Sequence, residues 1–219
     1  PKAFLDAFSK TGRARLAAVC DRNPDAMAEA MHNLPDVKRY TDYEEMLEQE
    51  DLDAVIIGTP MPLHVSQSLL ALEKNINVFS EVTAAVSVDE CRQLVAACKR
   101  SKAQYMMGEN CNYMRPYMVM RNLVQGGFLG EVFYAEGEYN HDCRYLIPKT
   151  PWRKQWLYDV GGITYGSHCL GPILSWFAND RISSVCCMGS GRSLNDLDGN
   201  PLQRDNSYVM LCKTEKNRL

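Results

Sequence analysis

Apolar and polar positions in the first half of the chain alternate between short hydrophobic runs and segments with helical spacing. The hydrophobic runs are residues 15–20, 53–58, 77–80 and 104–107. Helices of about 10–13 residues are predicted between them. Strands that alternate with helices predict a parallel sheet with right-handed crossovers. The run at 53–58 is continuous, which predicts a strand that is buried on both faces.

Polar residues mark the positions where the predicted helices begin. The Asn-Pro pair at 23–24 places a capping side chain before a proline in the first helical turn. Thr41 and Glu44 have the spacing of a capping box, and so do Ser87 and Glu90. We therefore expect helices to begin just after residues 23, 41 and 87.

The pattern changes in the second half of the chain. One more helix is predicted at 116–125, where Gly126-Gly127 would end it. Residues 131–139 alternate and are rich in aromatic side chains, which predicts a strand of a half-exposed, antiparallel sheet. The remaining predicted elements are a long loop at 144–162, a helix at 170–178, and strands at 182–188 and 208–213.

These elements predict two domains. An α/β domain with a parallel sheet would occupy residues 1–120, and an α+β domain with a mainly antiparallel, open sheet would occupy residues 121–219. Residues 1–8 are typical of the second half of a helix, and no G-x-G-x-x-G stretch occurs in the sequence. We therefore expect the first strand and the glycine-rich turn of the first domain to be missing from this chain.

The composition is that of an ordinary globular protein. Of 219 residues, 46% are hydrophobic and 23% are charged, which disfavours disorder, collagen-like repeats and a coiled coil. The formal charge of −3 gives no broad attraction to nucleic acid or to anionic lipid. No apolar run approaches the ~20 residues that cross a bilayer. We expect neither nucleic acid nor a membrane as a partner.

The nine cysteines are odd in number, are scattered along the chain and include no C-x-x-C pair. This usage predicts reduced thiols rather than a disulfide framework or a zinc site. It fits a reducing compartment, so we expect a cytoplasmic location, with an export signal before residue 1 left open. The four histidines are too few and too far apart to predict a metal site, although His141 and His168 are candidates.

Polar side chains follow the ends of four successive predicted strands. Asp21 ends the first, 59–64 follow the second, 81–83 follow the third, and Glu109-Asn110 follow the fourth. Open α/β sheets bind ligands at the carboxyl ends of their strands. In a dinucleotide-binding fold, a carboxylate in the position of Asp21 accepts hydrogen bonds from the adenosine ribose, although an Asp that only caps a turn is an equally good explanation.

Several stretches together resemble the Gfo/Idh/MocA superfamily of NAD(P)-dependent sugar oxidoreductases. They are D-R-N-P at 21–24, Y-T-D-Y-E-E-M-L at 40–47, D-A-V-I-I-G-T-P at 53–60, His64, and G-E-V at 130–132. The resemblance implies a Rossmann-type parallel sheet that binds NAD, followed by a domain whose open sheet faces the nicotinamide. It also implies a small carbohydrate substrate and a homo-oligomer formed through the C-terminal sheet. Whether the cofactor is NAD or NADP is left open.

Two departures point to one subgroup of that superfamily. Ordinary members have Glu-Lys-Pro where this chain has Glu81-Val82-Thr83, and D-x-x-x-H where it has Thr164 to His168. The NAD-dependent glycosidases typified by α-N-acetylgalactosaminidase share these departures. The stretches that match this subgroup are residues 81–85, 106–113, 136–142 and 164–172.

The resemblance also implies roles for individual residues. Those that would contact NAD are Asp21, His64, Glu81, Val82 and Asn110. Those that would line the sugar site are Tyr139, His141, Arg153, Tyr165 and His168. Tyr139, aided by His141, would be the base at C2 of the sugar, which requires a nearby cation to lower its pKa from about 10. His168 and Tyr165 would orient or deprotonate the C3 hydroxyl, and Arg153 would hold the substrate.

The favoured hypothesis is glycoside hydrolysis by oxidation at C3, elimination across C2 and C1, addition of water and reduction. Two alternatives remain. A plain NAD(P)-dependent sugar or inositol dehydrogenase would accumulate reduced cofactor with free sugars. A non-catalytic Rossmann-type binding protein would bind a nucleotide or a partner without turnover.

Overall fold

The computed structural model describes residues 10–146, 152, 162–177 and 179–219. The chain divides into two compact units, residues 1–108 and 109–219. The sequence placed the division after residue 120. The structure places it before Glu109 because the segment that follows Glu109 packs on a helix of the second unit.

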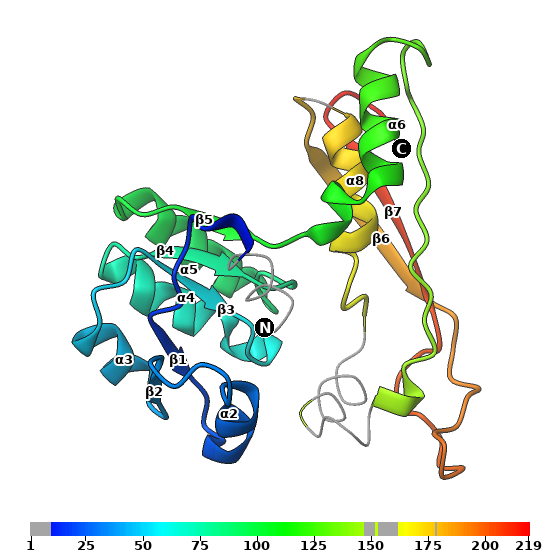
Figure 1. The fold of residues 1–219 in the computed structure, drawn as a ribbon. Helices are drawn as coiled ribbons and strands as arrows, with labels where there is room; N and C mark the ends of the chain where they lie inside the picture. The colour runs from blue at the N-terminus through cyan, green and yellow to red at the C-terminus, as the bar shows by residue number, and fades with distance from the viewer. Residues whose placement is uncertain (1–9, 147–151, 153–161, 178) are drawn as a thin grey trace. The chain divides into compact units, whose positions relative to one another are not determined.

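The first unit contains parallel strands, as the sequence predicted (Figure 1). β1 (Ala18–Cys20) pairs with β2 (Lys38–Tyr40), and a second sheet has the order β3 (Ala54–Ile57), β4 (Asn77–Ser80), β5 (Tyr105–Met107). Ile57 pairs with Ser80, and Ser80 with Met107, so the three strands of this sheet end at one level. The residues that follow them therefore share one edge of the sheet.

The helices of the first unit begin close to where the sequence predicted. They are α2 (Pro24–Ala30), α3 (Tyr43–Gln49), α4 (His64–Glu73) and α5 (Val88–Arg100), with a short 3₁₀ helix η1 (Met61–Leu63) before α4. The capping box of Ser87 and Glu90 is confirmed, with both of its reciprocal hydrogen bonds present. The predicted cap at Thr41 is wrong, because Asp42 caps α3 by accepting the backbone N–H of Glu45.

The core of the first unit lies on one face of the β3–β4–β5 sheet. Val55, Ile57 and Val78 are buried there beneath α4 and α5. The prediction that β3 is buried on both faces is wrong, since the side chain of Ile56 is 41% exposed. The strand alternates because the described helices that pack with this sheet contact its Val55 and Ile57 face.

The second unit combines helices with one antiparallel pair of strands. Its elements are η2 (Asn110–Tyr113), α6 (Arg115–Gln125), η3 (Arg144–Leu146), α8 (Ser167–Trp176), β6 (Ile182–Gly189) and β7 (Tyr208–Thr214). α6 and α8 lie side by side, and η2 packs against α8 (Figure 1). β6 and β7 pair antiparallel from Ile182 and Thr214 to Gly189 and Tyr208.

The strand predicted at 131–139 is not present as a strand. Within the described residues this segment exchanges two backbone hydrogen bonds with Leu219, one from the Ala135 N–H and one to the Phe133 carbonyl. A strand ladder repeats such hydrogen bonds along both of its strands, and two bonds to a single residue do not form one. The alternation of polar and aromatic residues here therefore produces an extended segment with exposed aromatic side chains.

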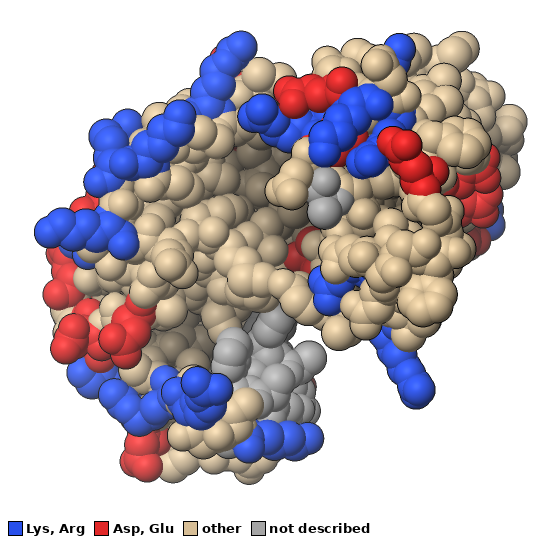
Figure 2. All heavy atoms as spheres, turned by 90° about the horizontal axis from the view of Figure 1, so that it is seen from above, with Lys and Arg blue, Asp and Glu red and all other residues tan. Residues whose placement is uncertain are grey.

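The charged side chains on the face drawn in Figure 2 are of both signs. Lys and Arg side chains lie close to Asp and Glu side chains over this face. Among the described residues, no helix combines the length and the apolar composition that a bilayer span requires.

Candidate active site

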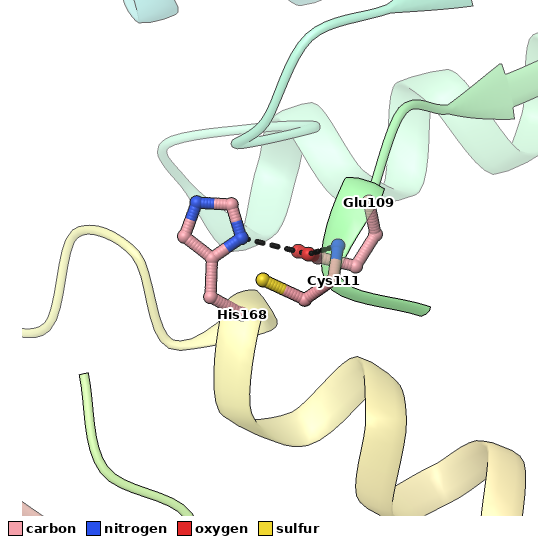
Figure 3. Close-up of side chains that lie close together, drawn as sticks. All are labelled: Glu109, Cys111 and His168. Atoms are coloured by element: carbon pink, nitrogen blue, oxygen red, sulfur yellow. Dashed lines mark hydrogen bonds and ion pairs between the residues drawn. The ribbon is translucent and has the colours of Figure 1, made fainter. Parts of the chain in front are cut away.

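A buried histidine–carboxylate pair forms the centre of the candidate site in the second unit. The Nδ1 atom of His168 lies 2.7 Å from the Oε1 atom of Glu109 (Figure 3). Their side chains are only 8% and 3% exposed. The same carboxylate oxygen accepts the backbone N–H of Cys111 at 3.0 Å. Glu109 is therefore held by its own turn while it binds a side chain from α8.

Local structure places the two partners. Glu109 follows the end of β5 and is the N-cap of η2, where its carboxylate accepts the Cys111 N–H. His168 is the second residue of α8, and α8 packs against η2. The first turn of α8 thus presents His168 to the first turn of η2.

The surroundings of Glu109 and Cys111 favour an ionised carboxylate on Glu109 and a protonated thiol on Cys111. Burial acts to raise the pKa of Glu109, but hydrogen bonds from His168 and from the Cys111 N–H more than offset it and hold that pKa below its usual value. Burial raises the pKa of the Cys111 thiol, and the negative charge of Glu109 raises it further. At neutral pH, Glu109 is therefore ionised and Cys111 is protonated.

Aromatic rings surround His168. The Tyr139 ring centroid lies 4.6 Å from that of His168 and 4.4 Å from that of His141. The Tyr165 ring stacks on His168 at 5.7 Å with an interplanar angle of 7°. Four of the five residues predicted to line a sugar site thus lie together. The fifth, Arg153, lies outside the described residues.

Tyr139 does not have the electrostatic environment that the sequence analysis expected. Its pKa is raised, first by burial and then by the acidic groups near it, which include Cys111 and Tyr165. A neighbouring cation was expected to lower this pKa. In the described residues the closest ring partners of Tyr139 are His141, His168 and Tyr165.

The residues predicted to contact NAD lie at strand ends in the first unit, apart from Asn110. Asp21 follows β1, is exposed, and accepts the backbone N–H of Asn23 at 2.8 Å. Glu81 is partly exposed and Val82 is buried, just beyond β4. Asn110 is exposed at the start of η2, in the second unit.

His64 differs from the other predicted NAD contacts. It is buried, and its two ring nitrogens lie 2.7 Å from the Thr83 carbonyl oxygen and 2.8 Å from the Thr59 carbonyl oxygen. Both nitrogens are therefore used within the protein. The ring ties the loop after β3 to the loop after β4 and has no free nitrogen for a cofactor.

A family model matches the first unit. Residues 2–109 match a family described as oxidoreductases with an NAD-binding Rossmann fold. Through these residues the chain belongs to the Gfo/Idh/MocA family. This confirms the resemblance seen in the sequence, and NAD is the cofactor named for the family.

Two curated relatives in Shewanella have names that match the predicted subgroup. The chain is 32% identical over 199 residues to a glycosyl hydrolase family 109 protein of Shewanella pealeana, which covers 82% of this chain and 44% of that protein. It is 30% identical over 212 residues to the alpha-N-acetylgalactosaminidase of Shewanella oneidensis, covering 88% of this chain and 46% of that protein. The chain thus spans a little less than half the length of these relatives.

Solved structures confirm the fold class. The chain is similar to the WlbA dehydrogenase from Bordetella pertussis, solved with NADH and UDP-GlcNAcA, with a TM-score of 0.79 and 19% identity over 99% of this chain and 64% of that chain. It is also similar to scyllo-inositol dehydrogenase from Lactobacillus casei, solved with NAD(H) and scyllo-inositol, with a TM-score of 0.71 and 18% identity over 94% and 60% of the two chains. At such identity the likeness shows the fold alone.

The protein also has a group of three potential metal ligands that was not predicted from the sequence. Ligand atoms of Glu109, Cys111 and His168 all lie within 4.8 Å of one another. Two ligands of a tetrahedral zinc ion lie about 3.3 Å apart, because each Zn–N or Zn–O bond is about 2.0 Å long. The 2.7 Å distance between His168 and Glu109 is that of a hydrogen bond. The arrangement is therefore better suited to holding a proton than a metal ion.

Glu109 and Cys111 were not among the predicted site residues. Glu109 stands beside Asn110 in the stretch 106–113 that carried the resemblance, and only Asn110 was given a role. A carboxylate two positions after the strand predicted at 104–107, with no basic residue beside it in the sequence, was the available signal. Its partner His168 is 59 positions away, so no local pattern could reveal the pair.

Proposed function

We propose that the protein is an NAD-dependent, sugar-active enzyme that hydrolyses glycosides by oxidation, elimination, addition and reduction. The observation that carries this proposal is the packing of Tyr139 and Tyr165 against His168, with His141 beside Tyr139. The names of the curated relatives support the substrate class, since they include a glycosyl hydrolase and an alpha-N-acetylgalactosaminidase.

The residues of the first unit fit the cofactor in part. Asp21 is exposed at the end of a parallel strand, and one carboxylate oxygen accepts the Asn23 N–H. The other oxygen is available to the hydroxyls of an adenosine ribose, and an acidic residue there favours NAD over the phosphate-bearing NADP. When bound, oxidised nicotinamide would accept a hydride from the sugar. We do not assign the His64 side chain a contact with the nicotinamide, because backbone carbonyl groups of the protein occupy both ring nitrogens of His64.

The residues around His168 would divide the proton transfers between two sugar carbons. His168 accepts the proton of the C3 hydroxyl, and Tyr165, stacked on its ring, orients that hydroxyl. Tyr139 acts at C2. Because its pKa is raised, Tyr139 needs a partner to take its proton, and His141 lies beside it at 4.4 Å. An imidazole accepts protons near neutral pH. Arg153 is proposed to hold the substrate.

The proposal is tested with the protein at its full natural length and a nitrophenyl α-N-acetylgalactosaminide in deuterated water. We expect release of nitrophenol without net formation of NADH, and deuterium at C2 of the sugar product. Retention of protium at C2 would overturn the elimination route. Net NADH formation from free sugars would identify a dehydrogenase instead. Binding of NAD without turnover of glycosides or free sugars would identify a binding protein.

The assembly and location of the protein belong to the same proposal. We propose a homo-oligomer formed through the C-terminal sheet, which is supported by the exposed apolar side chains of Met188 and Val209 on β6 and β7. All nine cysteines are free, which supports a reducing compartment such as the cytoplasm. Light scattering of the wild type and of Met188→Glu checks the assembly, and an unchanged mass would contradict the interface.

A further inference from the structure

We propose that Glu109 is a positioning residue that holds His168 with Nδ1 protonated and Nε2 free to accept a proton from the substrate. This inference rests on the proposed function and deepens it, because it assigns the reacting nitrogen and the group that prepares it. It starts from the 2.7 Å hydrogen bond between His168 Nδ1 and Glu109 Oε1.

The direction of that hydrogen bond fixes the tautomer. An ionised carboxylate can only accept hydrogen bonds, so the His168 nitrogen that faces it must donate. A neutral imidazole carries one N–H, which is thereby placed on Nδ1, and Nε2 is left as the acceptor. Glu109 cannot easily turn away, because its carboxylate also accepts the Cys111 N–H and its side chain is buried.

Packing fixes the orientation of the ring as well as its protonation. Tyr165 stacks on the His168 ring, and Tyr139 lies at a tilt beside it. Gly171, one turn further along α8, lets the helix approach Glu109 closely. A ring that is held at one nitrogen and packed by two aromatic rings presents its other nitrogen in one direction. Such fixed geometry is what proton transfer requires.

The pair also accounts for the charge that appears during the reaction. As the C3 hydroxyl is oxidised, its O–H bond breaks and the proton moves to Nε2. The O–H electron pair becomes part of the new carbonyl bond, and the C3 hydrogen, which leaves with its own electron pair, would be taken up by oxidised nicotinamide when that cofactor of the proposed function is bound. His168 is then an imidazolium, and the adjacent Glu109 carboxylate stabilises it. The proton returns to oxygen when the carbonyl is reduced.

The tautomer can be measured without turnover. In protein labelled with ¹⁵N-histidine, His168→Gln identifies the His168 resonances by their loss. We expect the wild type to show a protonated Nδ1 and an unprotonated Nε2. Glu109→Gln keeps the size of the side chain but can donate through its amide, so we expect Nδ1 to lose its proton in part or completely. An unchanged tautomer in a folded Glu109→Gln protein would overturn the proposal.

Kinetics separate positioning from substrate binding. We expect Glu109→Gln to lower kcat about 100-fold, the lower end of what a positioned base contributes, and to change KM by less than about threefold. Glu109→Asp keeps the charge and should recover part of kcat. Glu131→Gln, an exposed carboxylate of the same unit, is the matched control and should retain wild-type kcat. Equal loss of kcat in Glu109→Gln and Glu109→Asp would contradict a role for the charge.

Two further outcomes are distinguishable. One equivalent of zinc in the purified protein, lost in both Cys111→Ser and Glu109→Gln, would make the cluster a metal site and overturn the proposal. If the deuterium test of the proposed function fails while the tautomer changes as expected, the positioning role stands and only the reaction is wrong.

Discussion

Gly171 lies directly against Glu109: a Cβ atom on Gly171 would be 2.7 Å from the Cγ atom of Glu109 and 2.8 Å from the Oδ1 atom of Asn112. Real Cβ atoms do not approach other atoms this closely, so α8 and η2 can only pack in this way around a glycine. Because Gly171 has no side chain, α8 can approach η2 closely enough for His168 to reach Glu109.

Gly171→Ala should therefore destabilise the protein even though it lies within a helix. At an open helical position this change would stabilise by about 1 kcal/mol, since alanine has the higher helix propensity. Here the methyl group must push η2 away from α8, and such overpacking costs about 1–3 kcal/mol. We expect a lower urea midpoint together with a lower kcat, because the His168–Glu109 distance increases.

Gly127→Ala is the matched control. Gly127 has a φ of +78°, in open space after α6, so alanine there is strained by about 1–2 kcal/mol. We expect it to lower the urea midpoint but to leave kcat per folded molecule unchanged. A Gly171→Ala protein with wild-type kcat would show that the close approach of the two elements is not needed for activity.

Local patterns predicted the local part of the fold. The strands at 54–57 and 77–80 follow from short apolar runs, and the start of α5 follows from two residues three positions apart. Predictions that depended on distant neighbours failed more often. The alternation at 131–139 is a strand pattern, but a strand also needs a partner, and the described structure offers this segment only Leu219.

The candidate site likewise contains residues that local motifs predicted and a residue that they could not predict. Tyr139 and His141 are two positions apart, Tyr165 and His168 three, and motif resemblance placed both pairs. The carboxylate that contacts His168 comes from a turn 59 positions away. The raised pKa of Tyr139 depends on burial and on Cys111, which the chain supplies only once it has folded.

Asp42 and Thr41 provide a test of which residue caps α3. Asp42→Ala removes the side chain that accepts the Glu45 N–H at 3.0 Å and should cost about 1 kcal/mol. Thr41→Ala, one position earlier and exposed, should cost less than about 0.5 kcal/mol. Chemical unfolding of both variants compares the two, and a larger loss in Thr41→Ala would reject the cap seen in the structure.

Asp180 should make stability depend on pH. Its side chain is 0% exposed, accepts the Arg181 N–H at 2.9 Å, and lies 3.4 Å from the Nη1 atom of Arg218. Burial acts to raise the pKa of Asp180, but hydrogen bonds and the Arg218 charge lower it overall. A carboxyl with a lowered folded pKa adds stability above its unfolded pKa of about 3.9 and loses it as the pH falls through the folded value.

Asp180→Asn should therefore lower the urea midpoint at pH 7 and lower it much less at pH 3. Its amide nitrogen would also face the Arg218 guanidinium, donor against donor. Asp198→Asn changes an exposed carboxyl of the same unit and should have little effect at either pH. A wild-type midpoint for Asp180→Asn at pH 7 would show that the buried charge contributes nothing.

Tyr139→Phe should separate the two halves of the proposed reaction. The change keeps the ring beside His141 and His168 and removes the phenol. Because C3 chemistry is assigned to His168, oxidation should continue, whereas proton removal at C2 should slow at least about 100-fold. Reduced cofactor should then accumulate during a single turnover, seen by its absorbance, while deuterium incorporation at C2 disappears. Tyr145→Phe, an exposed tyrosine of the same unit, should behave as wild type in both measurements. Because the pKa of Tyr139 is raised above the usual value of about 10, Tyr139→Phe should also remove one late step from an alkaline titration of tyrosinate absorbance. Normal C2 exchange in Tyr139→Phe would transfer the role of base at C2 to one of the neighbouring histidines.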